Sequence, residues 1–207
     1  MDADAIELRV LGCLIEKQRT TPEAYPLSLN ALRLACNQST NRDPVVDYDE
    51  PTIRSALDRL AQKNWTRLAS GPGSRAVKFR HLFDEALGLS GEEIAVLCVL
   101  MLRGPQTPGE LKQRTPRLHN FAGLDEIERV LDGLIERELV SRLSRRPGQK
   151  EQRYEHQLGE DVAEAAPEQP VEGDDRLTEI ERELRALRDE VAALRAELAS
   201  SSIRAPR

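Results

Sequence analysis

Basic and hydrogen-bonding side chains gather on one expected helix of the chain, where they could contact nucleic acid. On residues 51–63 the apolar stripe of Ile53, Ala56, Leu57 and Leu60 leaves a polar face outward. Arg, Ser and Gln can hydrogen-bond base edges, and Arg or Lys can pair with phosphate. The sequence therefore predicts a DNA-binding face made of Arg54, Ser55, Arg59, Gln62 and Lys63.

Two expected strand pairs carry further basic residues beside turn-forming tips. Residues 65–70 and 76–81 flank the tip at 71–74, and residues 139–144 and 151–156 flank the tip at 145–148. The basic residues of the first pair are Arg75, Lys78 and Arg80, and those of the second are Arg142, Arg145, Arg146, Lys150 and Arg153. Such residues can bind phosphate, but basic residues on exposed strands are also ordinary solvated side chains, and both interpretations stay open.

The equivalent helix of the second half has a different charge pattern. It begins near Asp125 and carries five acidic residues against Arg129 and Arg137. Placing this helix against phosphates would cost binding energy, so we expect it to contact protein rather than DNA.

Residue types that could perform catalysis are few and scattered. His81, His119 and His156 form no Ser/His/Asp order, and no phosphate loop or metal-ligand spacing is present. Cys13, Cys36 and Cys98 each lie among apolar helical residues and are expected to be buried free thiols. We therefore expect no enzymatic activity, no cofactor and no metal.

The elements that position these residues follow one order twice. The first unit begins with a helix that ends near residue 18 and a short helix capped by Ser28 that ends near residue 36. A third helix, with Pro51 at its first helical position, and a strand pair complete the unit. Ser90 and Glu93 form a capping box for the next helix, and Thr107 caps a second, with Pro108 at its first position. Three helices followed by a hairpin is the element order of a winged helix. The sequence therefore predicts a mainly helical fold with small β-hairpins. Its two winged-helix domains are expected to span residues 1–86 and 87–158.

A residue register supports the duplication. Ile53, Leu57 and Leu60 match Ile127, Leu131 and Leu134 at an offset of 74. Past the helix the offset becomes 75, with residues 67–68 matching 142–143 and His81 matching His156. One residue inserted at the helix–strand junction would explain the change.

The C-terminal part has a different composition. Residues 159–173, rich in Glu, Ala and Pro, are expected to form a linker. Residues 174–200 predict a coiled coil, followed by a disordered tail at 201–207. The apolar seam is Leu177, Ile180, Leu184, Leu187, Val191, Leu194 and Leu198. Opposite charges at the flanking positions favour a parallel homodimer, the alternative being a single helix folded back on the chain.

The net charge of −6 belongs entirely to this C-terminal part. Residues 1–158 contain 23 basic and 23 acidic residues, and residues 159–207 contain 7 and 13. Binding to phosphate must therefore come from local patches. The chain carries no secretory signal and no apolar run of ~20 residues, so we expect a cytoplasmic protein without membrane contact.

Four segments carry a resemblance to a known family. They are RVLGCLIEKQ at 9–18, TTPEAYPLSLNAL at 20–32, ACNQSTNRDPV at 35–45 and LRGPQTPGELK at 102–112. On these motifs the chain resembles the YceH family of uncharacterised bacterial proteins. The resemblance implies a tandem winged-helix fold and brings no substrate, reaction or DNA site.

The sequence favours the first of two functions and leaves the second as its alternative. The first is a homodimeric regulator that binds double-stranded DNA. The second is a non-catalytic scaffold that binds a protein partner through its winged-helix units. The polar loop at 37–44 is expected to satisfy backbone groups in a long turn, with contact to a ligand or to DNA as the alternative.

Overall fold

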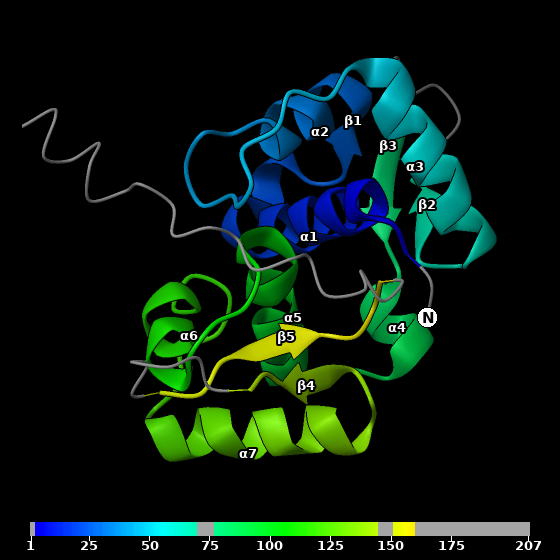
Figure 1. Ribbon diagram of the computed structural model, residues 1–207. Coiled ribbons are helices and arrows are strands. Elements are labelled where there is room, and N and C mark those ends of the chain that lie inside the picture. Colours follow the sequence, from blue (N-terminus) through cyan, green and yellow to red (C-terminus); the bar gives the residue numbers. More distant parts are fainter. Residues whose placement is uncertain (1–2, 70–76, 145–150, 160–207) are drawn as a thin grey trace, which may run out of the picture. The chain divides into compact units, whose positions relative to one another are not determined.

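A computed structural model describes residues 3–69, 77–144 and 151–159 (Figure 1). The described part is mainly helical and carries small antiparallel sheets, as the sequence predicted. Contacts divide the chain into a unit at Met1–Asp161 and a unit at Val162–Arg207. The predicted linker after Gly159, the coiled coil and the tail lie outside the described residues.

The first half forms a three-stranded sheet against helices. Its elements are α1 (Ala5–Thr20), the 3-10 turn η1 (Pro22–Ala24), β1 (Leu27–Ser28), α2 (Leu29–Cys36), α3 (Glu50–Gln62), β2 (Thr66–Leu68), β3 (Lys78–His81) and α4 (Phe83–Leu87). The strand order is β1-β3-β2, all antiparallel. Phe79 of β3 is central, because it pairs with both Leu27 and Leu68.

The second half repeats this order. It contains α5 (Gly91–Arg103), α6 (Pro108–Arg114), α7 (Leu124–Glu136), β4 (Val140–Arg142) and β5 (Tyr154–His156). Gln106 forms an isolated bridge with Tyr154, directly before the N-cap Thr107. Leu27 occupies the same place before the N-cap Ser28 and pairs with Phe79. The third strand of the first sheet is therefore reduced to a single bridge in the second.

Local chemistry explains where the helices begin. The predicted caps at Ser28, Ser90 and Thr107 are confirmed, each accepting the backbone N–H of the residue three positions on. A fourth cap, Asp4 with Glu7, closes a capping box on α1 that the sequence analysis did not select. The predicted position of Pro51 is wrong by one residue, because Asp49 caps α3 and Glu50 precedes the proline in the helix.

The place of the inserted residue is also different from the prediction. Asn64 and Glu138, 74 residues apart, each take positive φ (59° and 56°) directly after α3 and α7. The offset of 74 continues into the strands, because Leu68 pairs with Phe79 as Arg142 pairs with Tyr154. The extra residue therefore lies between the two strands of the second hairpin, and the helix–strand junctions match without a gap.

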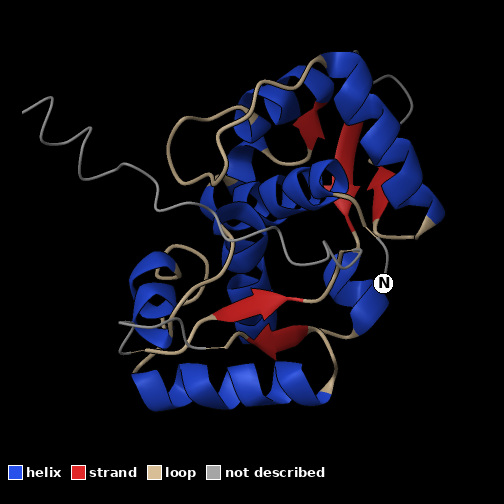
Figure 2. Cartoon of the chain, viewed as in Figure 1, coloured by secondary structure: helices blue, strands red, loops and turns tan. Residues whose placement is uncertain are grey.

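One hydrophobic core runs through both halves. The buried set includes Leu11 and Leu14 of α1, Ile53 of α3, Leu97 of α5 and Leu131 of α7. Helix α1 packs against α3 within its half and against α5 of the other half. The small size of Gly12 permits that approach, because a Cβ there would lie 2.9 Å from Leu102 Cγ. Figure 2 shows these helices with the small sheets beside them.

No helix in the described ranges is long and apolar enough to cross a membrane.

Candidate nucleic-acid interface

The outward face of α3 retains part of the predicted DNA-contacting set. Arg54, Ser55 and Gln62 are exposed. Arg54 and Gln62 make no hydrogen bond or ion pair with other described residues, so their donors are available to a ligand. Ser55 Oγ accepts a hydrogen bond from Arg59 Nη1 at 2.8 Å, which ties two predicted residues together.

The two other cations of this helix are engaged by the N-terminus of α1. Arg59 Nη2 lies 2.6 Å from Asp4 Oδ2, and Lys63 Nζ donates to Glu7 Oε1 at 2.7 Å. The side chain of Glu7 is only 2% exposed. Removing Lys63 from this partner would leave a buried carboxylate without its closest cation, which is costly. The geometry thus gives Lys63 a structural partner within the fold.

The same ion pair recurs in the second half. Arg137 Nη1 donates to Glu93 Oε1 at 2.8 Å, and Arg137 follows α7 as Lys63 follows α3. Glu93 is the capping-box residue of α5, as Glu7 is of α1. Both halves therefore use one carboxylate to cap the first helix and to fix the end of the third.

The first hairpin presents fewer free cations than the sequence suggested. Arg80 Nη2 lies 2.5 Å from Glu85 Oε1, and Lys78 is half-buried. Arg75 lies outside the described residues. Arg67 was not among the predicted DNA-contacting residues. It is exposed, and its backbone lies opposite that of Arg80 in the β2–β3 pair. Cross-strand neighbours share a face, so Arg67 adds a cation that strand alternation could have indicated.

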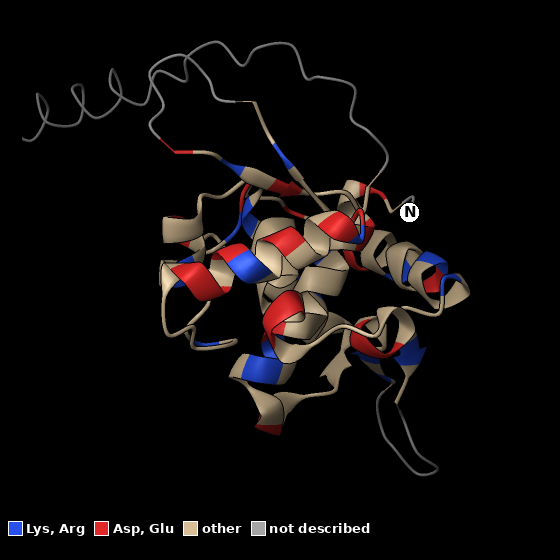
Figure 3. Cartoon of the chain, turned by 90° about the horizontal axis from the view of Figure 1, so that it is seen from below, with Lys and Arg blue, Asp and Glu red and all other residues tan. Residues whose placement is uncertain are grey.

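The described cations of the second hairpin are paired with acidic residues of the same half. Arg142 Nη2 lies 2.7 Å from Asp132 Oδ1, and its guanidinium lies 5.8 Å from the centre of the Tyr154 ring. Arg153 Nη1 donates to Glu110 at 2.9 Å and to the carbonyl of Pro105 at 2.7 Å. Arg145, Arg146 and Lys150 lie outside the described residues. In the view of Figure 3, acidic and basic segments alternate along the elements.

The loop at 37–44 is built around a buried arginine. Arg42, 6% exposed, donates to both carboxylate oxygens of Glu16 (2.7 and 3.1 Å) and to the carbonyl of Ala35 (3.1 Å). The guanidinium overcomes the burial of Glu16 and lowers the pKa of that carboxyl. Asn37 closes the segment by bonding the backbone N–H and carbonyl of Tyr48. These bonds support the prediction that the loop satisfies its own backbone.

The histidines of the hairpins occupy equivalent, enclosed positions. His81 is fully buried, its Nε2 lies 2.6 Å from Gln18 Oε1, and burial lowers its pKa to about 4. Burial also lowers the pKa of His156 to about 4. The predicted burial of all three free cysteines is confirmed, and burial raises the pKa of Cys98.

The comparisons with known proteins agree over most of the chain. A family described as "Protein of unknown function, DUF480" matches residues 3–149. A UPF0502 protein of Pelobacter propionicus is 51% identical over 201 residues, which cover 91% of each chain. UPF0502 proteins of Serratia proteamaculans and of a Shewanella species are 46% and 43% identical and cover 93% and 96% of this chain, and 95% and 100% of their own.

The chain belongs to the DUF480 family. This is the UPF0502 group to which YceH belongs, so the resemblance predicted from the four motifs is confirmed. Membership of the DUF480 family brings no activity with it, so any functional argument must come from the residues themselves.

One further cluster in this DUF480 protein was not selected from the sequence. Ligand atoms of Glu92, His119 and Glu126 lie within 4.8 Å of one another. The carboxylate of Glu126 also accepts the backbone N–H of Ala122 at 2.7 Å, so it helps to order the loop before α7. The three residues come from separate segments, so their spacing in the sequence gave no signal.

Proposed function

We propose that this DUF480 protein is a homodimeric, non-catalytic regulator that binds double-stranded DNA through the first of two winged-helix units. The order of three helices with β1-β3-β2 in one antiparallel sheet supports a winged helix for the first unit. In that fold the third helix enters the major groove and the hairpin contacts a flanking groove or phosphates.

The exposed face of α3 carries the proposal. Arg54 and Gln62 project into solvent without partners among the described residues, and their donors suit guanine and adenine edges. Arg67 extends the contact onto the hairpin. Arg59 can exchange Asp4 for phosphate, because both side chains are partly exposed (37% and 48%) and surface pairs contribute little. Lys63 holds the helix in place through Glu7.

A mobility-shift assay on genomic DNA fragments tests this function at ~50 mM salt, where phosphate contacts are strongest. Arg54→Ala should weaken binding to preferred fragments by about tenfold, whereas Arg67→Ala should weaken binding to all fragments alike. Arg129→Ala, on the exposed face of α7, is the matched control and should leave binding unchanged. The absence of any shifted fragment would remove DNA binding from the proposal.

Dimerisation is proposed through residues 174–200. A dimer would place two α3 helices on a roughly two-fold site. Light scattering should give twice the chain mass for the full protein and one chain mass after residues 174–207 are removed. A monomeric full-length chain would contradict the proposed dimer. The mobility-shift assay would then decide whether the monomer binds DNA.

The second candidate function is a protein-binding scaffold, which a groove in the second half favours. Pro108, Leu124, Glu128, Asp132 and Tyr154 are among the residues that line this groove of about 470 Å³. Leu124 is 44% exposed at the start of α7. A pull-down whose capture is unaffected by salt and lost in Leu124→Glu would support this function over DNA binding, because apolar contacts are weakly screened.

A further inference from the structure

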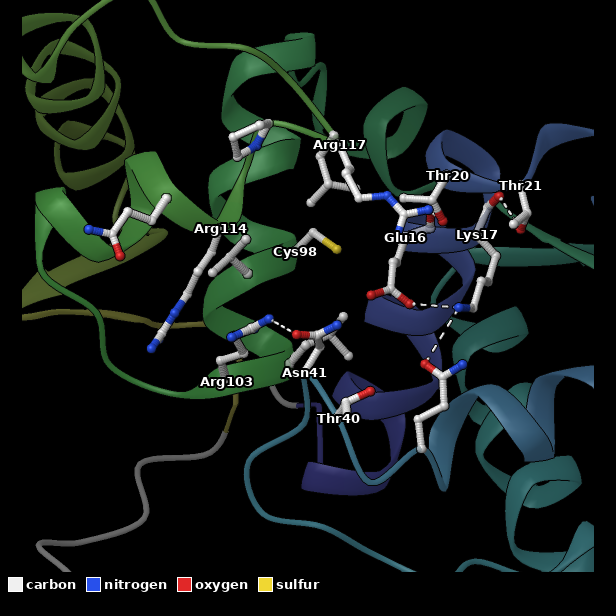
Figure 4. A pocket seen from close by; sticks show the side chains of 16 residues that line it. Glu16, Lys17, Thr20, Thr21, Thr40, Asn41, Cys98, Arg103, Arg114 and Arg117 are labelled. Atoms are coloured by element: carbon white, nitrogen blue, oxygen red, sulfur yellow. Dashed lines mark hydrogen bonds and ion pairs between the residues drawn. The ribbon is translucent and has the colours of Figure 1, made fainter.

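A cavity of about 590 Å³ opens where the C-terminal turns of α1 face α5 and the segment after α6. Cationic side chains come to it from three segments: Lys17 from α1, Arg103 from the end of α5, and Arg114 and Arg117 from α6 and the residues after it. Figure 4 shows Arg117 extending toward Glu16 and Thr20, with Arg103 and Arg114 on the opposite side. The cavity shares no lining residue with the exposed face of α3 or with the groove beside α7.

The carboxylate in the cavity does not neutralise these cations. Glu16 is already paired with the buried Arg42 at 2.7 Å, and Lys17 lies 3.2 Å from the same oxygen. Arg103 donates to the amide oxygen of Asn41, a neutral group. Arg103 and Arg117 form no ion pair with a carboxylate of the described residues. Within the lining of this cavity, four cationic side chains thus face one carboxylate, Glu16, which Arg42 already balances. Arg114 has a second carboxylate 4.0 Å away, that of Glu110, which lines an adjoining cavity and not this one.

The cations are also close enough to repel one another. Partial burial lowers the pKa of Arg103, and the positive charges of Arg114 and Arg42 lower it further. A bound anion would relieve this repulsion and replace the lost hydration of the guanidinium. Arg103 and Arg114 also line an adjoining cavity of about 290 Å³, together with Arg153 and the acidic residues Asp43 and Glu110.

The walls give the cavity the character of a small-molecule site. Its volume lies within the ~300–1,000 Å³ typical of such sites. Val99, Leu102 and Leu118 supply apolar surface, and Thr40 supplies a hydroxyl group that can donate to an anion. The hydroxyls of Thr20 and Thr21 already donate to backbone carbonyls of α1. The loop at 37–44 therefore contributes one wall, while Arg42 inside it fixes Glu16. Guanidinium groups bind phosphate oxygens in bidentate fashion, which favours a phosphate-bearing ligand in a cavity lined by three arginines.

We infer that this cavity binds a small anionic metabolite carrying two or more phosphate groups, held by Arg103, Arg114, Arg117 and Lys17. Two linked phosphates would meet the guanidinium of Arg117 on one side and those of Arg103 and Arg114 on the other. The inference does not depend on DNA binding, because none of these residues belongs to the α3 face.

Isothermal titration calorimetry of the full chain with inorganic pyrophosphate tests this site, with sodium chloride adjusted to constant ionic strength. Pyrophosphate should bind in the micromolar range and orthophosphate more weakly. Arg117→Gln should weaken pyrophosphate binding by about tenfold, the effect of losing one charge-assisted contact. This exposed residue has no partner among those described, so the variant should fold. Arg103→Gln should act similarly, and Arg129→Gln on α7 is the control that should bind as the wild type does.

Three outcomes would overturn the inference. The first is that the wild type does not bind pyrophosphate. The second is that the Arg103→Gln/Arg117→Gln double variant binds pyrophosphate as tightly as the wild type. The third is that Arg117→Gln loses binding to duplex DNA while the wild type binds no pyrophosphate. The last result would assign these cations to a nucleic-acid surface. Arg54→Ala should leave pyrophosphate binding intact, so the failure of the DNA proposal and of this one can be told apart.

Discussion

At the scale of single residues, Glu7 and Glu93 do the same two tasks in different surroundings. Each closes a capping box and each pairs with the cation that follows the third helix of its half. Glu7 is 2% exposed, and Glu93 is 18% exposed. The charge of Glu7 is therefore screened less by water, and its pair with Lys63 should contribute more to stability.

Glutamine substitutions at the two positions measure this difference. Gln keeps the capping geometry and removes the charge. Glu7→Gln should lower the free energy of unfolding by about 1–3 kcal/mol, the range for hydrogen bonds to charged groups. Glu93→Gln should lower it by less than about 1 kcal/mol, as for exposed pairs. The urea midpoints of the two variants measure these losses of stability. An equal or larger loss of stability in Glu93→Gln would contradict the greater contribution expected of Glu7.

His81 should make stability depend on pH. Its folded-state pKa of about 4 lies below the ordinary value near 6.5, because burial disfavours the imidazolium, although Asp84 lies 3.5 Å away. Below pH 6.5 the unfolded chain takes up a proton that the folded chain does not. Stability is therefore fully present above that pH, is lost as pH falls toward 4, and is not lost further below it.

His81→Gln should reduce this loss. The variant removes the titrating group and keeps a polar side chain near Gln18. Between pH 7 and pH 5 the urea midpoint of the wild type should fall more steeply, by the equivalent of about 1–2 kcal/mol. Parallel curves for the two proteins would show that His81 does not contribute, leaving His156 as the other buried histidine to be tested in the same way.

At the scale of elements, close packing of α1 on α5 depends on Gly12. A Cβ there would lie 2.9 Å from both Cγ and Cδ2 of Leu102, whose side chain is 3% exposed and has little room to move. Gly12→Ala should lower stability by about 1–2 kcal/mol, since overpacking outweighs the gain in helix propensity.

Gly133 supplies the control for that substitution. It lies inside α7, and a Cβ there would meet nothing within 4 Å. Gly133→Ala should raise stability by about 0.5–1 kcal/mol, because alanine loses less backbone entropy in a helix. Opposite shifts in thermal midpoint are expected, and a stabilised Gly12→Ala variant would show that α1 and α5 can separate without cost.

Elements also show which features the sequence could reveal. Helix starts at Ser28, Ser90 and Thr107 depend on residues three positions apart, so they were predictable. Strand β1 has two residues and exists only through its pairing with β3, and no local pattern indicates it. The contact between Lys63 and Glu7 joins residues 56 positions apart, so the cations of α3 seemed free in the sequence although two are paired.

The cavity shows most clearly that the sequence does not reveal which distant residues come together in the fold. Its cations come from residues 17, 103, 114 and 117, which share no motif. The family motifs include Lys17 and Arg103 but end before Arg114 and Arg117, and spacing alone could not show that the four residues converge. By contrast, the exposed face of α3 follows directly from helical periodicity, which is why Arg54 and Gln62 were predicted correctly as outward residues.

At the scale of the whole described unit, the two repeated halves should unfold together. Their buried side chains form one cluster, and α1 packs on α5 across the repeat. Separating the halves would expose Gly12, Met101 and Leu102 to water, so neither half retains its full core alone.

Trp65, 6% exposed and packed edge-on against Phe83, reports on the first half alone, whereas far-ultraviolet circular dichroism reports on the helices of both halves. Urea unfolding followed by Trp65 fluorescence and by circular dichroism should give coincident midpoints, as a two-state transition requires. A fluorescence midpoint clearly separated from the circular dichroism midpoint would mean that the halves unfold as independent domains, which would support the division at residue 86 that the sequence predicted.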